Sequence, residues 1–448
     1  MAEGPLDRLA AYATGLRLDD EVVLAHALVV IRDTLGTMLA GLVQSENAAL
    51  AANAGALGGP GRATVVGRDE GTVPHIAALV NGTAAVTLEL DEGNQFATHH
   101  PAVHVLPAAL AMAEQRGRSG RALLEAFVAG YEVAVRVARV TRLRDPVHPF
   151  GTTAITGAVA AAARLEGLDA RGTAAAMRLA VGTVVASSQS AANAGASVRS
   201  LSTGLTGHHG VLAVSLVQAG FAGEPHAPDA VFGRVLGDHF DAARLDADLD
   251  RFFITRNYFK THACSRWNHA PIEAAAALMT EEPVEPQAVT RVVVWTFDPA
   301  TRLDGRDPPN GYAAKHSIPY NVAVRFVCGT NGLEAYSDET VADPLVRQLA
   351  ERVEVREDPA FTAAAPELRI ARVELTLADG RVRTATVERA PGGHDNPYDE
   401  ATLQAKFRDL AGRALAPEAV QHLAQAVHDL PRLSNLSALT SPLRSARP

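Results

Sequence analysis

The sequence is poor in cysteine and in aromatic residues, and both shortages narrow the possible folds. Only Cys264 and Cys328 occur among the 448 residues, too few for a disulfide-rich secreted fold, a four-cysteine zinc site or an all-cysteine iron–sulfur cluster. Aromatic residues make up 5% of the chain, whereas its apolar segments are rich in alanine and glycine. This composition favours closely packed helices over a β-sandwich, which would use more aromatic and β-branched side chains.

An excess of basic residues is also missing. The formal net charge is −9, whereas a nucleic-acid-binding surface needs a broad basic face. The charge therefore argues against nucleic acid as a partner. Any anionic partner must be small and bound by a local group of basic residues.

No segment is typical of secretion or of insertion into a membrane. Residues 1–7 do not have the basic stretch followed by an apolar stretch that marks a secretory signal. The most apolar early segment, residues 22–42, contains His26, Arg32 and Asp33. These polar residues predict a buried helix and not a membrane span, so we expect a cytoplasmic protein.

The pattern along the chain predicts two domains, because 448 residues are too many for one compact core. Residues 20–255 have a helical pattern, after which the chain becomes strand-like. The predicted strands are 291–297, 351–356, 368–377 and 381–387, with Asp379-Gly380 as a hairpin turn between the last two. The predicted later helices are 316–327, 400–415 and 417–430.

We therefore predict a mainly α fold with an inserted α+β domain. Residues 1–259 and 397–448 form the large helical domain, and residues 260–396 form the smaller domain. Within the helical domain, residues 151–165 and 179–196 carry many small side chains, which permit close approach between helices. We predict a polar break between such helices at residues 196–204.

The first candidate cluster joins acidic residues to histidines. Glu89, Asp91 and Glu92 are followed closely by His99, His100 and His104. A carboxylate next to an imidazole orients the ring and raises its pKa, which suits a general acid or base. For this cluster taken alone, the sequence favours helix-capping acids with hydrogen-bonded histidines over a catalytic pair. Metal binding by His100 and His104, which have i, i+4 spacing, is a less favoured interpretation, since a proline follows His100 and no HExxH motif occurs.

Two further candidates lie beside predicted helices. His148 lies between Pro146 and Pro149, before a helix whose free N–H groups suit a carboxylate. Arg199 lies in the predicted polar break and could bind a carboxylate bidentately. A helix-entry turn and an ordinary surface arginine are the alternative explanations.

The remaining candidates lie at the predicted domain boundary and beyond it. Lys260, Arg266 and His269 lie near residue 260, and small ligands favour sites between domains. Tyr320 opens a predicted helix and could donate a hydrogen bond or a proton, although most tyrosines simply pack. No P-loop, GxGxxG, GxSxG or CxxC motif is present. Imidazoles, carboxylates, a tyrosine and local cations suit proton removal beside a carboxylate without a cofactor.

Taken in order, these segments resemble the MmgE/PrpD family, which includes 2-methylcitrate dehydratase, cis-aconitate decarboxylase and an iminodisuccinate epimerase. The resemblance covers nearly the whole chain. It rests on the acidic stretch 89–92, the HP-x-x-x-V-L-P-A-A-L-A pattern from His100, Gly130-Tyr131-Glu132, His148-Pro149, Arg266-Trp267-Asn268-His269 and Lys315-His316-Ser317-Ile318-Pro319-Tyr320.

The resemblance implies a large helical domain, a smaller α+β lid and a homodimer. It also implies an active site between the domains that needs no metal or other cofactor. The pocket histidines of the family map onto His100, His148 and His269, and its pocket tyrosine maps onto Tyr320. Glu89 and Asp91, in the acidic stretch, would shape or orient this site.

Two departures from the family pattern bear on the substrate. Where the family commonly has T-K-x-x-H-x-G, this chain has Arg199 for the lysine and Ser202 for the histidine. Arginine keeps the positive charge but almost never donates a proton. His99 and His104 also flank His100, where we expect threonine or serine and an apolar residue. These differences argue against 2-methylcitrate itself as the substrate.

Our first hypothesis is a cofactor-independent lyase that dehydrates a small hydroxy-carboxylic acid by general acid–base catalysis. The residues assigned are Arg199, Lys260 and Arg266 for carboxylate binding, His100 or His148 for proton removal, and His269 or Tyr320 for protonation of the leaving hydroxyl. The alternatives are a decarboxylase or an epimerase of a small di- or tricarboxylate on the same scaffold, and a homologue that binds an acid without converting it.

Overall fold

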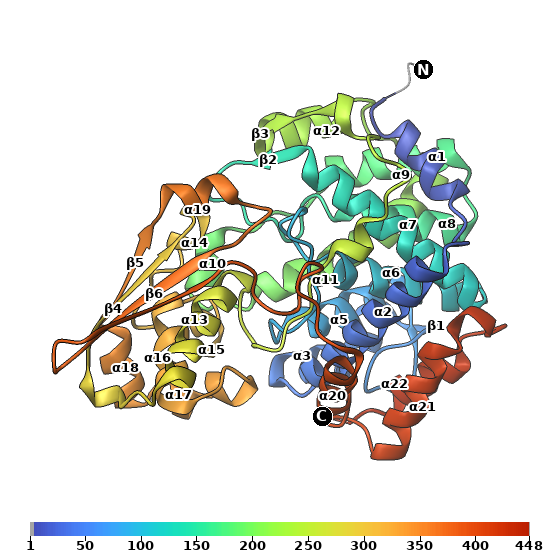
Figure 1. The fold of residues 1–448 in the computed structure, drawn as a ribbon. Helices are drawn as coiled ribbons and strands as arrows, with labels where there is room; N and C mark the ends of the chain where they lie inside the picture. Colours follow the sequence, from blue (N-terminus) through green and yellow to red (C-terminus); the bar gives the residue numbers. More distant parts are fainter. Residues whose placement is uncertain (1–3, 448) are drawn as a thin grey trace.

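The computed structural model describes residues 4–447, which form a helical domain and a smaller α+β domain side by side (Figure 1). The predicted mainly α fold with an inserted α+β domain is confirmed. The longer helices of the helical domain are α1 (Asp7–Gly15), α2 (Glu21–Leu42), α3 (Ser45–Ala52), α5 (Pro74–Val86), α6 (Pro101–Gln115), α7 (Gly120–Arg139), α8 (Ile155–Glu166), α9 (Ala170–Gly182), α11 (Val198–Gln218), α20 (Glu400–Ala411), α21 (Pro417–His428) and α22 (Ser437–Ser445). Its shorter elements are α4 (Ala54–Gly58), α10 (Gln189–Asn193), α12 (Ala227–Ala230), β1 (Pro60–Ala63) and the antiparallel pair β2 (Thr141–Leu143) and β3 (Gly237–Phe240).

The smaller domain, called the lid domain below, is built on a four-stranded sheet of order β5-β4-β6-β7. Strands β4 and β5 are parallel, and the other pairs are antiparallel. The strands are β4 (Val289–Thr296), β5 (Val353–Glu357), β6 (Ala371–Leu377) and β7 (Val382–Val387). The helices are α13 (His269–Glu281), α14 (Asp298–Thr301), α15 (Gly311–Ala314), α16 (Ile318–Cys328), α17 (Asp338–Val341), α18 (Pro344–Ala350) and α19 (Pro359–Ala364).

The sheet of the lid domain follows from the period-2 pattern of its strands. In β6 the side chains of Val373 and Leu375 are fully buried, whereas the side chains between them are half-buried. One face of the sheet therefore packs in the core, against α13 and α16 (Figure 1). The turn between β6 and β7 contains Gly380 at φ +84°, a conformation that favours glycine, so the hairpin predicted at Asp379-Gly380 is confirmed.

The apolar segment at residues 22–42 forms α2. Asp20 caps this helix by accepting hydrogen bonds from the N–H groups of Val22 and Val23. Among residues 4–447, α2 is the one helix that is long and apolar enough by composition to cross a membrane, and most of that stretch is buried. It packs against α5 and α20, which confirms the prediction of a buried helix.

Small residues let the central helices of the helical domain approach closely. Gly130 of α7 lies against Gly157 of α8, so a Cβ atom added at either position would lie well inside 3.0 Å of the backbone oxygen of the other. Gly204 of α11 lies against Leu79 of α5 in the same way. The close packing predicted from the alanine and glycine content is confirmed for α8.

The polar break predicted at residues 196–204 is wrong. Most of this segment forms the first turns of α11, which begins at Val198, and the irregular stretches lie earlier, at residues 183–188 and 194–197. Serine is tolerated inside this helix because its hydroxyl can bond to the backbone of the preceding turn. Ser202 does so by donating to the carbonyl of Arg199 at 2.7 Å.

The chain passes between the two domains twice, through residues 257–268 and 388–399. The two segments lie together, because Phe259 donates its N–H to the carbonyl of Gly392 at 2.9 Å. Tyr258 and Gly93 also exchange two backbone hydrogen bonds, of 2.8 and 3.1 Å. The first segment is thereby fixed against the acidic loop that precedes α6, and the predicted boundaries at 260 and 397 fall within these two segments.

The α7–α8 crossing predicts the effect of a single methyl group. Gly157→Ala should lower the free energy of unfolding by at least about 2 kcal/mol, because the helices must separate to relieve the clash with Gly130. Gly182→Ala, at the end of α9, should change it by less than about 1 kcal/mol, since nothing lies within 4 Å of the added atom. Urea unfolding of both variants measures the difference. Equal effects would contradict the close crossing.

Candidate active site

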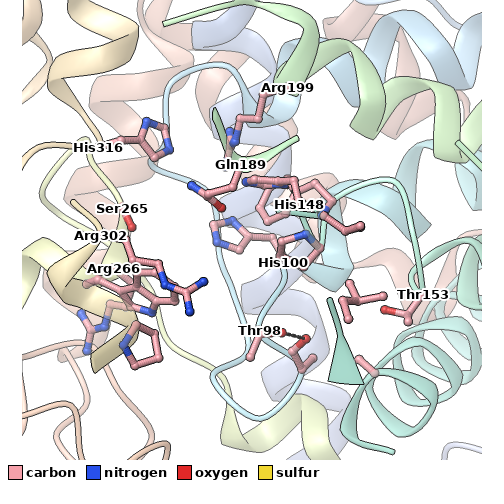
Figure 2. A pocket seen from close by; sticks show the side chains of 18 of the residues that line it. Thr98, His100, His148, Thr153, Gln189, Arg199, Ser265, Arg266, Arg302 and His316 are labelled. Atoms are coloured by element: carbon pink, nitrogen blue, oxygen red, sulfur yellow. Dashed lines mark hydrogen bonds between the residues drawn. The ribbon is translucent and has the colours of Figure 1, made fainter. Parts of the chain in front are cut away.

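A cavity of about 410 Å³ lies between the helical domain and the lid domain (Figure 2). A volume of this order accommodates a small organic molecule. Three parts of the chain supply side chains that line it: the helical domain (Glu89, Thr98, His100, His148, Phe150, Gln189 and Arg199), the first crossing segment (Tyr258, Ser265 and Arg266) and the rest of the lid domain (Arg302, His316 and Arg369).

The loop between α5 and α6 supplies the acidic residues of the site. Glu89 and Thr98 have left-handed backbones, with φ of +57° and +56°, which is unfavourable by roughly 1–2 kcal/mol for a side chain other than glycine. The two residues bracket the segment that contains Asp91 and leads to His100. Such strain persists where surrounding interactions determine the conformation, and it is common at functional sites.

His100 is held by Asp91 and faces Tyr258. Its Nδ1 lies 2.5 Å from Asp91 Oδ2, so Nδ1–H donates to the carboxylate. Its Nε2 lies 3.2 Å from the Tyr258 hydroxyl, which donates to it in this tautomer. Burial lowers the pKa of His100, and Asp91 opposes this effect only in part. The result is an oriented, neutral imidazole whose Nε2 can accept a proton.

Glu89 is the centre of a buried ion cluster. One carboxylate oxygen pairs with the Arg199 guanidinium, and the other lies 3.4 Å from Lys260 Nζ, which is also 3.7 Å from Asp91. Burial opposes ionisation of Glu89, but the charges of Arg199 and Lys260 outweigh it and hold its pKa well below the usual range. Arg199 also stacks 4.2 Å above the Phe150 ring centre. Two cations thus balance two carboxylates away from bulk water.

Two further histidines line the cavity and differ in their tautomers. His148 Nδ1 accepts the Phe150 N–H at 3.1 Å, so its Nε2 carries the proton. His316 Nδ1 lies 3.0 Å from the carbonyl of Tyr312 and donates to it, so its Nε2 is the acceptor. Burial lowers the pKa of both rings, to about 4 for His316. In Figure 2 His316 lies across the cavity from His148 and His100.

A second polar network supports the acidic loop from behind. Glu92 accepts hydrogen bonds from the hydroxyl of Tyr131 at 2.5 Å and from Asn257 at 3.2 Å. Its N–H donates to Asp33, which is paired with Lys406 of α20 at 2.5 Å. Burial raises the pKa of Glu92 to about 8, so this carboxyl is protonated at neutral pH. Without an adjacent cation, a buried carboxyl is more stable in its neutral form.

The structure brings most of the predicted site residues together around the cavity. Those that line it are Glu89, His100, His148, Arg199 and Arg266. Asp91 and Lys260 lie behind this surface and reach it through His100 and Glu89. Their side chains are fully buried, so they act through the groups in front of them.

Tyr320 does not reach the cavity. Ser317 caps α16, which places Tyr320 in the first helical turn, where its side chain turns into the core of the lid domain. Its hydroxyl donates to the carbonyl of Ala335. His316, just before the cap, lines the cavity instead. The assignment of Tyr320 is therefore corrected to His316, which belongs to the same motif.

His269 lies behind the cavity lining as well. Its Nδ1 accepts a hydrogen bond from Arg266 at 3.1 Å, and its ring centre is 5.0 Å from that of His262. Burial, reinforced by the charge of Arg266, holds the pKa of His269 well below its usual range. The sequence assigned His269 to the cavity, and the structure shows it positioning Arg266.

Several cavity residues were not assigned from the sequence. Tyr258 was not among the residues assigned from the sequence, and its position next to His100 becomes visible only once Gly93 and Tyr258 pair. Gln189 and Arg369 have no sequence signal, since each lies in a segment without a motif.

His100 and His104, the histidine pair with i, i+4 spacing, do not point their rings at a shared metal position, because His104 Nδ1 donates to the carbonyl of His100 at 2.6 Å. Among residues 4–447, no three His, Cys, Asp or Glu side chains are grouped to hold a metal ion.

Comparison with known proteins places both domains in one family. Residues 7–240 match the MmgE/PrpD N-terminal domain, and residues 262–431 match the MmgE/PrpD C-terminal domain. The human protein named cis-aconitate decarboxylase is 27% identical over 398 residues, which are 84% of this chain and 80% of that protein. The protein of the same name from Aspergillus terreus is 25% identical over 410 residues, 85% of this chain and 83% of that protein. A mitochondrial 2-methylcitrate dehydratase from Yarrowia lipolytica is 30% identical over 176 residues, 36% of this chain and 34% of that protein.

The raised pKa of Glu92 predicts a pH-dependent stability difference. A carboxyl whose pKa is raised to about 8 on folding stabilises the protein below its unfolded pKa of 4.5, and this contribution is lost as the pH rises through 8. Glu92→Gln removes the titration. The variant should therefore gain stability relative to the natural protein between pH 5 and pH 9, by at least about 1 kcal/mol at pH 9.

Urea unfolding at pH 5, 7 and 9 checks this expectation. Glu418→Gln, at an exposed position of α21, is the matched control and should show a difference that does not depend on pH. A Glu92→Gln difference that is flat with pH would contradict a protonated Glu92.

Proposed function

The chain belongs to the MmgE/PrpD family, and from this premise we propose that it is a cofactor-independent decarboxylase of a small tricarboxylic acid of the cis-aconitate type. The observation that carries the proposal is the Asp91–His100 pair, which presents an oriented imidazole Nε2 to a cavity of suitable size. Such a group can transfer a proton to or from carbon.

Decarboxylation is better supported than the dehydration that was our first hypothesis. The relatives named cis-aconitate decarboxylase match more than four-fifths of the chain, whereas the 2-methylcitrate dehydratase matches about a third of it. Dehydration also needs an acid for the leaving hydroxyl. His269 and Tyr320, which were assigned that role, do not line the cavity.

The reaction requires one proton to be placed on carbon. Loss of CO2 breaks one C–C bond and leaves an electron pair on the substrate, which then forms a C–H bond with a proton from an acid. In the proposed reaction His100 donates that proton from Nε2, and Asp91 stabilises the imidazolium before the transfer. The acid then returns to the neutral form that burial favours.

The proton reaches His100 when the substrate binds. Burial by protein groups alone keeps the pKa of His100 below its usual value. An anion with three carboxylates beside Nε2 favours the charged form of the ring and raises that pKa. Substrate binding and protonation of His100 are thereby linked, so His100 becomes protonated when the substrate binds.

Removal of the imidazole should abolish turnover. His100→Asn should lower kcat/KM for cis-aconitate by about 10²–10⁴-fold, because a positioned acid contributes that much. His422→Asn, at an exposed position of α21, is the control and should leave kcat/KM unchanged. CO2 release and ¹H NMR of the product in D₂O measure the reaction.

The D₂O experiment separates the candidate reactions. Decarboxylation gives CO2 and one solvent-derived deuterium on carbon for each product molecule. Deuterium at a stereocentre without loss of mass would indicate epimerisation, and loss of water without CO2 would indicate dehydration of a hydroxy acid. Binding without exchange across a panel of di- and tricarboxylates would indicate a non-catalytic homologue. Each of these three results would overturn the proposal.

Proton uptake on binding can be measured without turnover. The probe is propane-1,2,3-tricarboxylate, the saturated analogue of cis-aconitate. When it binds at pH 7, the protein should take up close to one proton from solution. Calorimetry in two buffers of different ionisation enthalpy gives this number. In His100→Asn the uptake should vanish while binding persists. An uptake of equal size in the variant would assign the proton to another group.

A further inference from the structure

The cations nearest the acidic loop are already neutralised. Arg199 pairs with Glu89, and Lys260 lies between Glu89 and Asp91. This group of two cations and two carboxylates therefore has little net positive charge to offer an anionic ligand. A substrate with three carboxylates needs positive charge from another part of the cavity.

Arg266 is a cavity residue whose charge is not neutralised. Its Nη1 and Nη2 donate to the carbonyls of Pro391 and Ala390, at 2.7 and 2.8 Å. Carbonyl oxygens hold a guanidinium in place but do not cancel its charge. The group also lies 5.0 Å from the centre of the Tyr258 ring. Arg266 is thus fixed at the cavity wall without a carboxylate in direct contact. Asp395, whose charge acts on it from farther away, is paired with Arg389 at 2.8 Å.

Arg369 approaches the same tyrosine from a different part of the lid domain. It lies just before β6, and its Nη2 donates to the carbonyl of Gln95 at 3.2 Å. Its guanidinium is 5.9 Å from the centre of the Tyr258 ring. Among residues 4–447, no carboxylate lies within 4.0 Å of either Arg266 or Arg369. Two unneutralised guanidinium groups therefore flank one aromatic ring at the cavity wall.

The other arginines of the cavity differ in exposure. Arg142, Arg144 and Arg302 are exposed to solvent at its rim. Arg142 is paired with Asp238, and Arg302 with Asp145. Exposed charges are screened by water and salt, so the half-buried pair at Tyr258 is the stronger anion site.

We propose that Arg266 and Arg369 form a carboxylate-binding subsite on the ring of Tyr258, and that this subsite selects di- and tricarboxylate substrates. The inference rests on the proposed function and names the part of the substrate that the site recognises. Guanidinium groups suit this role because they present several N–H donors in one plane to a carboxylate.

The subsite holds a carboxylate that stays on the product. A carboxylate that leaves as CO2 loses its negative charge, so a cation bound to it would stabilise the substrate more than the transition state and slow the reaction. A retained carboxylate keeps its charge throughout. Tyr258 links the subsite to His100, since its hydroxyl lies 3.2 Å from His100 Nε2. The retained group is therefore bound next to the atom that transfers the proton.

Binding measurements with unreactive ligands test the subsite. The probes are propane-1,2,3-tricarboxylate and glutarate, titrated calorimetrically into the natural protein and its Arg369→Gln and Arg266→Gln variants. Each variant should bind both probes about 10- to 100-fold more weakly, as expected for loss of a charge-assisted contact. Arg369→Lys and Arg266→Lys, which keep the charge, should recover part of that loss. Added salt should weaken binding less in the glutamine variants than in the natural protein.

Arg372→Gln is the matched control. Arg372 also stacks on an aromatic ring, Trp295 at 5.4 Å, but it does not line the cavity. This variant should change the affinity of either probe by less than 2-fold. Because Arg266 also holds the backbone at residues 390–391, Arg369→Gln is the decisive variant, and a thermal unfolding measurement checks that it is folded.

The outcomes separate the subsite from the proposed function. Affinities within 3-fold of the natural protein in Arg369→Gln would overturn the subsite, even where CO2 release from cis-aconitate persists. Failure of the natural protein to bind either probe at millimolar concentration would overturn it as well. Loss of binding in the glutamine variants, in a protein that releases no CO2 from cis-aconitate, would support the subsite and overturn only the decarboxylase.

Discussion

The site depends on the balance of charges buried around Glu89. An ionised carboxylate in a protein interior is strongly unfavourable unless cations and hydrogen bonds compensate it. Here the compensating groups come from distant segments, Arg199 from α11 and Lys260 from the first crossing segment. Asp91 adds a second carboxylate and positions His100. The acid–base group can therefore be placed only when the helical domain and the crossing segment are folded together.

The two domains contribute different electrostatics to the cavity. The helical domain supplies neutral histidines and the carboxylates of Glu89 and Asp91, whose charges are balanced by Arg199 and by Lys260 of the first crossing segment. The first crossing segment and the lid domain supply guanidinium groups that are held by backbone carbonyls and remain unneutralised, as at Arg266 and Arg369. In the proposed function, an anionic ligand between the domains completes this balance. A local pair of arginines of this kind could bind a small polyacid on a protein that has no broad basic surface. This agrees with the expectation drawn from the net charge of −9.

Much of the fold and part of the site could be predicted from the sequence, because both rest on local patterns. The hairpin at Gly380 and the buried α2 follow from turn chemistry and composition. His100 and His148 could be found because they lie in motifs beside helices. Tyr320 was assigned to the cavity in place of His316, because the sequence alone does not show on which side of the helix cap at Ser317 the cavity lies. Arg369 could not be found at all, since its role comes from a ring, Tyr258, more than one hundred positions away.

The replacement of the usual lysine by Arg199 assigns the proton chemistry to the imidazoles. A guanidinium stays charged at any pH at which the protein is folded, and this one is paired with Glu89 and stacked on Phe150. It stabilises the buried Glu89 carboxylate but cannot supply a proton. The neighbouring His100 has the opposite properties, because its pKa is set by burial against one carboxylate and responds to the charge of a ligand. In the proposed reaction, stabilisation of Glu89 and proton transfer are therefore divided between Arg199 and His100, and the arginine is compatible with a reaction in which its position is only electrostatic.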